Sequence, residues 1–135
     1  MNALPWNLRQ LDGAGYLVGD VDDLQRWDDA LLSGLLLHGK WRQLYLAPGA
    51  LANGTPAFAS AENPTSGIRA VFCNGGMAKV TISGHVAYLA NGGTMGFSTF
   101  TGTIPDRHVS VTMLSNVRAS GNDAITIPLM KLLAK

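Results

Sequence analysis

The sequence has few charged residues. Asp, Glu, Lys and Arg make up 14% of its 135 residues, whereas about a quarter is typical of soluble domains. The formal net charge is +1 and the basic residues are scattered along the chain. This distribution lacks the basic patch that nucleic-acid binding requires, so we expect no nucleic-acid partner.

Cysteine and long apolar runs are also scarce. A single cysteine, Cys73, excludes an internal disulfide and is typical of a reducing compartment. We expect it to be a small buried hydrophobic residue rather than a reactive thiol. No basic-then-apolar leader opens the chain, and no apolar run reaches the roughly 20 residues that cross a bilayer. A cytoplasmic location without a membrane partner is therefore expected.

Common catalytic and metal-binding motifs are absent as well. Gly39-Lys40 is followed by Trp41, which excludes a phosphate-binding loop, and Gly96–Phe100 fails the last position of a G-x-S-x-G elbow. There is no C-x-x-C or H-E-x-x-H motif. The histidines lie too far apart for ligand spacing: His38, His85 and His108. We expect no metal and no cofactor.

The first clear pattern is a helix that begins near Asp20. The Asp20-Val-Asp-Asp23 segment places an N-cap residue before two carboxylates at the positive end of the helix dipole. Capping accounts for these aspartates without a role as general acids. An apolar stripe follows at three- and four-residue spacing, and the helix is expected to end at Gly34 or Gly39. The stripe residues are Leu24, Trp27, Leu31 and Leu35.

Two further helices are expected. Lys40–Leu46 is compatible with a short helix before turn-forming residues at Pro48-Gly49, Asn53–Pro56 and Asn63-Pro64. Residues 123–134 carry a second apolar helical stripe, in which Pro128 is acceptable only within the first turn. That stripe consists of Ile125, Leu129, Leu132 and Leu133.

Residues 68–114 have the pattern of an antiparallel meander. Asn74-Gly75-Gly76 and Ser83-Gly84 predict hairpin turns, because Asn and Gly tolerate positive φ. The predicted strands are Arg69–Cys73, Met77–Ile82, His85–Leu89, Phe97–Ile104 and His108–Leu114, the last two joined at Pro105-Asp106. The predicted fold class is α+β: one domain over residues 1–135, with N-terminal and C-terminal helices packed on an antiparallel sheet.

A glycine-rich stretch, Ala-Asn-Gly-Gly-Thr-Met-Gly-Phe, covers residues 90–97. It lacks the G-x-G-x-x-G spacing of a nucleotide loop and precedes residues that favour a strand over a helix. Local reasoning therefore favours a turn or bulge between strands.

Several segments together resemble a known family. Gly15–Trp27 resembles the glycine-then-helix segment of class C serine β-lactamases and of the related penicillin-binding proteins, esterases and D-alanyl-D-alanine carboxypeptidases. Residues 90–99 are similar to the family's K-T-G-x-T-x-G-F-x-S or H-x-G-G-T-x-G-F-S-S strand. Ile104–Arg107 and Met113–Asn116 resemble its I-P-[DE] turn and following strand. The resemblance covers nearly the whole chain, but corresponds to about the C-terminal third of a full-length member.

The resemblance implies an acyl-transfer site whose chemical groups this chain lacks. In the family the serine of Ser-x-x-Lys attacks an amide or ester, and Tyr-x-Asn assists proton transfer. None of the four lysines here follows a serine at that spacing, and none of the three tyrosines precedes an asparagine at that spacing. Ala90 occupies the Lys or His position of the third motif, so we expect no catalytic residue. The resemblance leaves a vestigial ligand groove, with the Gly93 N–H in the oxyanion-donor position: Ala90, Asn91, Gly92, Gly93 and Thr94.

Three functions are compatible with these observations. The first is a truncated, non-catalytic domain that covers its exposed sheet by forming a homodimer. The second is the C-terminal half of a split serine hydrolase, completed by a missing N-terminal partner chain. The third is a module that binds small acids or peptides in the old groove.

Overall fold

The computed structural model describes residues 18–57, 67–94, 96–117 and 122–135. Three of the features discussed above lie outside these residues: the Gly15–Leu17 start of the glycine motif, Asn63-Pro64, and Met95. The helices are α1 (Val21–Ser33), α2 (Gly39–Leu46) and α3 (Asn122–Leu133). The strands are β1 (Val71–Phe72), β2 (Ala78–Ile82), β3 (His85–Thr94), β4 (Phe97–Ile104) and β5 (Val109–Ser115), and the 3-10 turn η2 (Pro105–Arg107) joins the last two.

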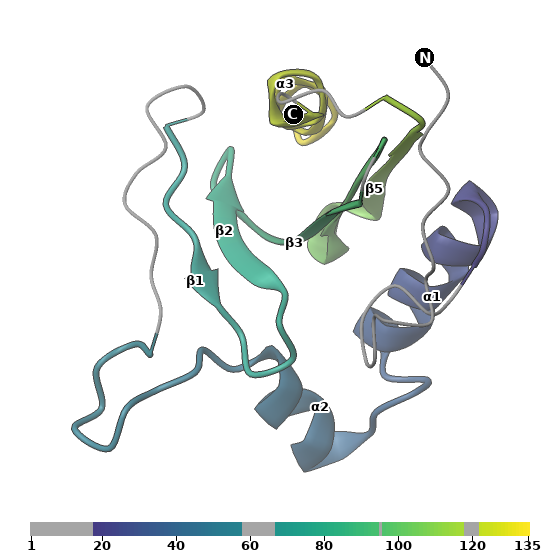
Figure 1. Cartoon of the computed structure of the whole chain (residues 1–135). Helices are drawn as coiled ribbons and strands as arrows, with labels where there is room; N and C mark the ends of the chain where they lie inside the picture. Colours follow the sequence, from purple (N-terminus) through teal and green to yellow (C-terminus); the bar gives the residue numbers. More distant parts are fainter. Residues whose placement is uncertain (1–17, 58–66, 95, 118–121) are drawn as a thin grey trace.

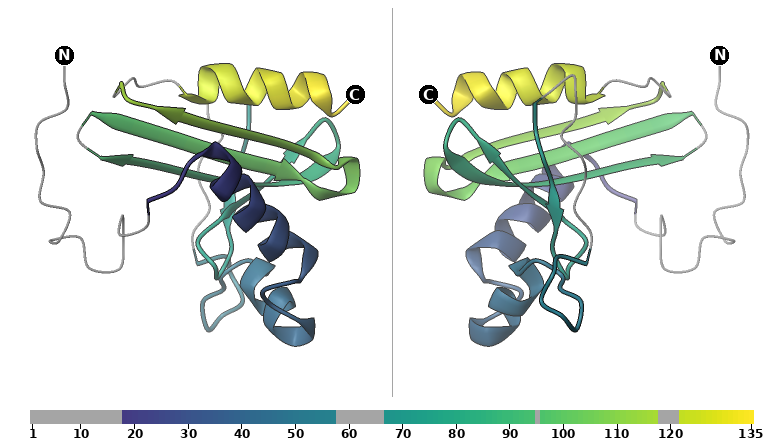
Figure 2. Two further views of the ribbon diagram at one scale, coloured as in Figure 1. Left: turned by 90° about the vertical axis from the view of Figure 1, so that its right-hand side faces the viewer. Right: turned by 90° about the vertical axis from the view of Figure 1, so that its left-hand side faces the viewer.

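The strands form one antiparallel sheet in chain order, β1-β2-β3-β4-β5 (Figure 1). Helix α3 lies across one face of the sheet over β4 and β5, and α1 packs on the opposite face (Figure 2). This arrangement confirms the predicted α+β class and the predicted meander.

Both predicted hairpin turns are present. Ser83 and Gly84 adopt φ values of 50° and 87°, and Ile82 pairs with His85 on either side of them. Two residues with positive φ between paired strands match the twist of a tight hairpin. At the first turn, the Cys73 N–H donates to the Met77 carbonyl at 2.8 Å. Local turn chemistry therefore sets the register of β1, β2 and β3.

Helix α1 begins and ends as predicted. The Asp20 side chain accepts a hydrogen bond from the Asp23 N–H at 2.9 Å, and Gly34 ends the helix at φ 91°. The predicted apolar stripe is wrong in part, since Trp27 is 52% exposed and Leu35, beyond the helix end, is 69% exposed. The buried face instead carries Asp28, Leu31 and Leu32, because a polar partner on the sheet accommodates Asp28.

Helix α3 also has the predicted extent but buries a different face. Its buried residues are Thr126, Ile127 and Met130, so the predicted stripe of Ile125, Leu129, Leu132 and Leu133 is exposed. Apolar residues occupy both sides of this helix, and periodicity alone does not select the side that meets the sheet. Pro128 lies in the middle of the helix rather than in its first turn. Proline has no N–H to donate to the carbonyl of Ala124, four residues earlier. Both residues lie on the exposed side of the helix, where water can bond that carbonyl instead.

Two apolar clusters hold the layers together, one on each face of the sheet. The cluster under α3 contains Val80, Ile82, Ala87, Phe100, Ile104, Val111, Ile127, Met130 and Ala134. The smaller cluster under α1 and α2 contains Leu31, Leu32, Leu46 and Met77. Within the part of the chain that the structure describes, no helix combines the length and apolar character that a bilayer crossing requires.

Candidate functional site

The glycine-rich residues 90–94 form the second half of strand β3. The local prediction of a turn between strands holds only for the end of residues 90–97, since Asn91, Gly92 and Gly93 pair with Phe100, Thr99 and Ser98 of β4. The chain reverses only after Thr94, which pairs with Phe97. Glycine has a steric role in this strand, because a Cβ at Gly92 would lie 3.0 Å from Thr99 Oγ1.

This half of β3 has an open backbone edge. Strand β2 pairs with β3 only as far as Leu89, and no described strand pairs with residues 90–94 on the side away from β4. Antiparallel hydrogen bonds alternate between the two neighbours of a strand, so the register directs the N–H and C=O groups of Asn91 and Gly93 away from β4. An extended ligand could pair with these groups.

A polar hollow lies beside this edge. It has a volume of about 440 Å³, and side chains from β3, β4 and the start of α3 line it. Asn122 Nδ2 donates to Ser98 Oγ at 3.0 Å, and Ser98 Oγ donates to the Val117 carbonyl at 3.1 Å. Sequence reasoning missed Ser98, Thr99, Asn122 and Asp123 as neighbours of the glycines. No local pattern marks Asn122 and Asp123, because only the packing of α3 on the sheet brings them here.

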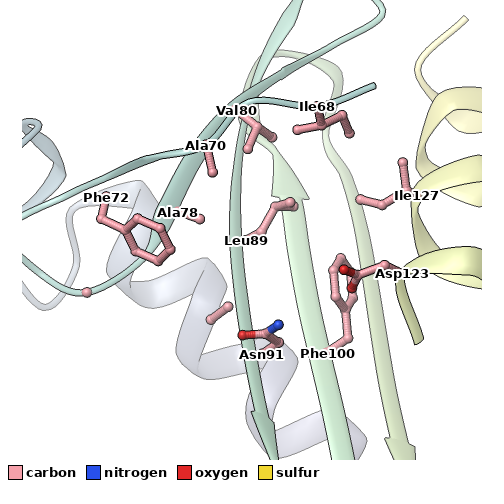
Figure 3. A pocket seen from close by; sticks show the side chains of 12 residues that line it. Ile68, Ala70, Phe72, Ala78, Val80, Leu89, Asn91, Phe100, Asp123 and Ile127 are labelled. Atoms are coloured by element: carbon pink, nitrogen blue, oxygen red, sulfur yellow. The ribbon is translucent and has the colours of Figure 1, made fainter. Parts of the chain in front are cut away.

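An apolar groove of about 250 Å³ lies next to the polar hollow, between the first three strands and α3. Figure 3 shows Leu89, Phe100 and Ile127 pointing into it, with Asn91 and Asp123 also on its wall. The groove therefore adds an apolar surface to the polar groups at the β3 edge. Such a combination is typical of sites for small ligands or peptide side chains.

Ala90 also borders this groove, but its pairing places its side chain on the face of the sheet toward α1. It pairs with Thr101, and directly paired residues project to the same face. The Thr101 hydroxyl donates to the carboxylate of Asp28, which is 3% exposed. Thr112 extends the network, because its hydroxyl lies 3.3 Å from Thr101 Oγ1 and donates to Gln25 Oε1 at 3.1 Å.

Asp28 is the buried acid of this network. Burial raises the pKa of its carboxyl group, and the Thr101 hydrogen bond acts in the opposite direction. The described contacts of Asp28 include no cation and no nucleophile with an adjacent base. The group joins α1 to the sheet, and we assign it no catalytic step.

The remaining sequence candidates lie away from residues 90–94. His85 Nδ1 is 2.6 Å from Asp106 Oδ2 at the opposite end of β3, and this hydrogen bond lowers the pKa of Asp106. Cys73 is buried as predicted, and its burial raises the pKa of the thiol. His38 and His108 are exposed. The described residues contain no group of three or more His, Cys, Asp or Glu side chains placed to hold a metal ion.

Comparison with known proteins gives one informative result. Neither the curated proteins nor the solved structures yielded a match. A family model described as Beta-lactamase matches residues 2–135, which includes every part of the chain described above. The order of elements agrees with the motif resemblance, because the glycine-rich strand is followed by the Ile104–Arg107 turn and then by strand β5. On this evidence the chain belongs to the Beta-lactamase family.

Proposed function

We propose that residues 1–135 form a single partial Beta-lactamase-like domain that is non-catalytic by itself and forms a homodimer. The observation that carries the proposal is Ala90, which stands where the motif resemblance places a Lys or His. A methyl group can supply neither positive charge nor a proton to an acyl-transfer step. The absence of Ser-x-x-Lys and Tyr-x-Asn from the sequence supports the same conclusion.

The surroundings of Ala90 also support this proposal. The residue opposite is Thr101, whose hydroxyl is already bonded to the buried Asp28 carboxyl. A serine needs an adjacent base to become a nucleophile. The hydroxyl of Ser98, the serine that lines the hollow, bonds the Val117 carbonyl and Asn122 rather than an amine or imidazole.

We expect no turnover of a chromogenic cephalosporin or of a short p-nitrophenyl ester by the purified chain. An active class C β-lactamase serves as the positive control. Turnover that a serine-directed inhibitor abolishes would contradict the proposal. Turnover that arises only after addition of a chain carrying Ser-x-x-Lys and Tyr-x-Asn would instead establish the split-hydrolase alternative.

A second candidate function is ligand binding, which the open edge at Asn91 and Gly93 favours. Outward N–H and C=O groups on an unpaired strand segment are the groups that β-strand addition uses. The ligand class is a short peptide or carboxylate that pairs with this edge and reaches the hollow lined by Asn122 and Asp123.

Thermal denaturation with benzylpenicillin or N-acetyl-D-alanyl-D-alanine tests this binding. A ligand at 100 times its Kd stabilises the folded state by about 2.7 kcal/mol, which raises Tm measurably. Gly93→Pro removes the outward N–H and should abolish the shift. Gly93→Ala keeps that N–H, and its Cβ has only an ordinary contact with the Phe97 carbonyl at 3.5 Å, so the shift should persist. Equal shifts for both variants, or none for the wild type, would refute binding at this edge.

A feature of the surface supports the homodimer. Large apolar side chains are exposed on all three described helices, including Trp27, Trp41 and Leu133. Isolated apolar residues are normal on a protein surface, but many together on a small domain indicate a surface that another chain covers.

A further inference from the structure

Among the residues that the structure describes, strand β5 forms an outer edge of the sheet. It is last in the strand order, and no described strand pairs with its outer side. Natural edge strands usually carry charged residues or proline that block pairing with another chain. Val109–Ser115 reads VSVTMLS and contains neither. This edge therefore lacks the usual protection against strand addition.

The register shows which backbone groups the edge presents. Thr94 and Phe97 close the β3–β4 hairpin, and the backbone groups of successive β4 residues point alternately to β3 and to β5. In the register of β4 and β5, the hydrogen bonds between them therefore fall on every second residue of β5, beginning at Val109. The hydroxyl contacts Thr103–Ser110 and Thr101–Thr112 agree, because side chains approach most closely at the non-hydrogen-bonded pairs. The outward N–H and C=O groups therefore belong to Ser110, Thr112 and Leu114.

These outward groups are self-complementary. They are spaced evenly about Thr112, so a second copy placed antiparallel on a two-fold axis would pair Thr112 with Thr112 and Ser110 with Leu114. Each outward donor would then meet an acceptor on the other copy. An interface of this kind is isologous, and it closes after two chains instead of growing into a fibre.

Helix α3 contributes an apolar flank beside the same edge. Met130 points at the sheet, and Ile127 lies on the flank that lines the groove toward β1 and β2. At 100° per residue, Leu129 and Leu133 fall on the opposite flank, toward the outer edge, and Lys131 falls on the groove side. Leu129 is 40% exposed and Leu133 is 45% exposed.

The layer spacing brings the two copies of α3 into contact. Helix α3 lies over β4 and β5 (Figure 2). If two β5 strands pair at about 4.8 Å, a helix centred between β4 and β5 lies about 10 Å from its symmetry mate. Packed helices have interaxial distances of about 8–10 Å. Pairing of the two β5 strands and packing of the two α3 helices are therefore compatible on this face of the sheet.

We infer that the chain forms a two-fold homodimer in which β5 pairs antiparallel with β5 of a second copy, centred on Thr112. Leu129 and Leu133 of the two α3 helices pack together across the joined sheet. The inference rests on the homodimer of the proposed function and assigns it an interface. It is independent of whether the chain has hydrolase activity.

A pair of substitutions at Leu114 tests the strand contact. Leu114→Pro removes an N–H that points outward, so the bonds to β4 stay intact while a bond across the dimer is lost. Leu114→Ala shortens the same side chain but keeps the N–H. Sedimentation equilibrium should show that Leu114→Pro raises the dimer Kd about tenfold or more relative to Leu114→Ala.

A second pair tests the helix contact. Leu129→Glu places like charges near the two-fold axis and should also raise the dimer Kd about tenfold or more. Leu132→Glu makes the same chemical change on the outward side of α3, and its dimer Kd should match that of the wild type. Circular dichroism and thermal melts of all four variants separate loss of the dimer from loss of the fold.

The outcomes separate the interface from the dimer itself. A wild-type chain that is monomeric at tens of micromolar overturns both the homodimer and the proposed interface. The partner of the β5 edge would then be a different chain. A wild-type dimer that neither Leu114→Pro nor Leu129→Glu weakens, with both variants folded, overturns only the interface. A dimer that weakens with Leu114→Pro and Leu129→Glu but not with their controls supports it.

Discussion

Replacing Met130 with alanine is expected to lower the free energy of unfolding by about 2–5 kcal/mol, the range for large-to-small substitutions in a packed core. Met130 is 0% exposed and belongs to the apolar cluster between α3 and the sheet. It lies over Gly102, where a Cβ would approach Met130 Sδ to 2.7 Å. The space that the methionine side chain leaves is therefore enclosed by the sheet. Neither neighbouring side chains nor water can fill it without a cost in free energy.

Urea denaturation at one fixed protein concentration measures this effect, because a dimer makes stability depend on concentration. Leu132→Ala on the exposed side of the same helix should change the stability by no more than about 0.5 kcal/mol. Gly102→Ala should destabilise the wild type by overpacking, yet be tolerated better in the Met130→Ala background, where its methyl group enters the vacated space. Additive effects in this double-mutant cycle would contradict the close packing of the two residues.

The second large effect concerns pH and Asp28. In the folded chain, burial raises the pKa of this carboxyl group above its ordinary value of 3.8. As the pH rises, Asp28 therefore loses its proton in the unfolded chain before it does so in the folded chain. This difference lowers the free energy of unfolding of the wild type until the pH passes the pKa of Asp28 in the folded chain. Each unit of difference between the two pKa values corresponds to about 1.4 kcal/mol.

Asp28→Asn removes this titration while keeping an oxygen that accepts the Thr101 hydroxyl. We expect the stability of the Asn variant relative to the wild type to increase as the pH is raised from about 4 to 7. Asp28→Ala loses the acceptor as well, which costs about 1–3 kcal/mol for an unsatisfied buried partner.

Urea midpoints measured across this pH range provide the test. Leu132→Ala, at an exposed residue without a titratable group, should leave the pH profile of the wild type unchanged. Parallel profiles for the wild type and Asp28→Asn would show that Asp28 titrates alike in the folded and unfolded chain, and would refute the effect of burial.

The turns and the strand order were predictable from sequence because their causes are local. Asn74–Gly76 and Ser83-Gly84 supply positive φ or a compact turn, and the alternating residues between them determine the register. The capping box of α1 was predictable for the same reason, since Asp20 and Asp23 bond to each other within one turn. For these elements the sequence contains both bonding partners within a few residues.

The faces of α1 and α3 depend on partners far away in the sequence. Asp28 is buried because the Thr101 hydroxyl donates a hydrogen bond to its carboxyl group. Met130 is buried because Gly102 has no side chain and leaves space for it. Neither partner can be inferred from helical periodicity, so the apolar residues Trp27 and Leu129 were expected to be buried and are exposed. Periodicity identified the helices correctly but not their orientation.

The candidate site was predictable only in part. The motif resemblance located residues 90–94 on a strand, whereas local reasoning from their glycines favoured a turn. The open edge beyond Leu89 could not be foreseen, because it depends on where β2 ends relative to β3. Asn122 and Asp123 complete the hollow only through the docking of α3.

The strand order of the sheet also has a kinetic consequence. Every pairing from β1 to β5 joins neighbours in the chain, so each hairpin closes only a short loop. The contact between Asp28 and Thr101, in contrast, closes a loop of 73 residues. Low contact order favours rapid formation, so the sheet can assemble as successive hairpins before α1 docks. The strand pairings of such a meander depend on turns that are local in the sequence, so the sheet does not need the distant contacts of α1 in order to form.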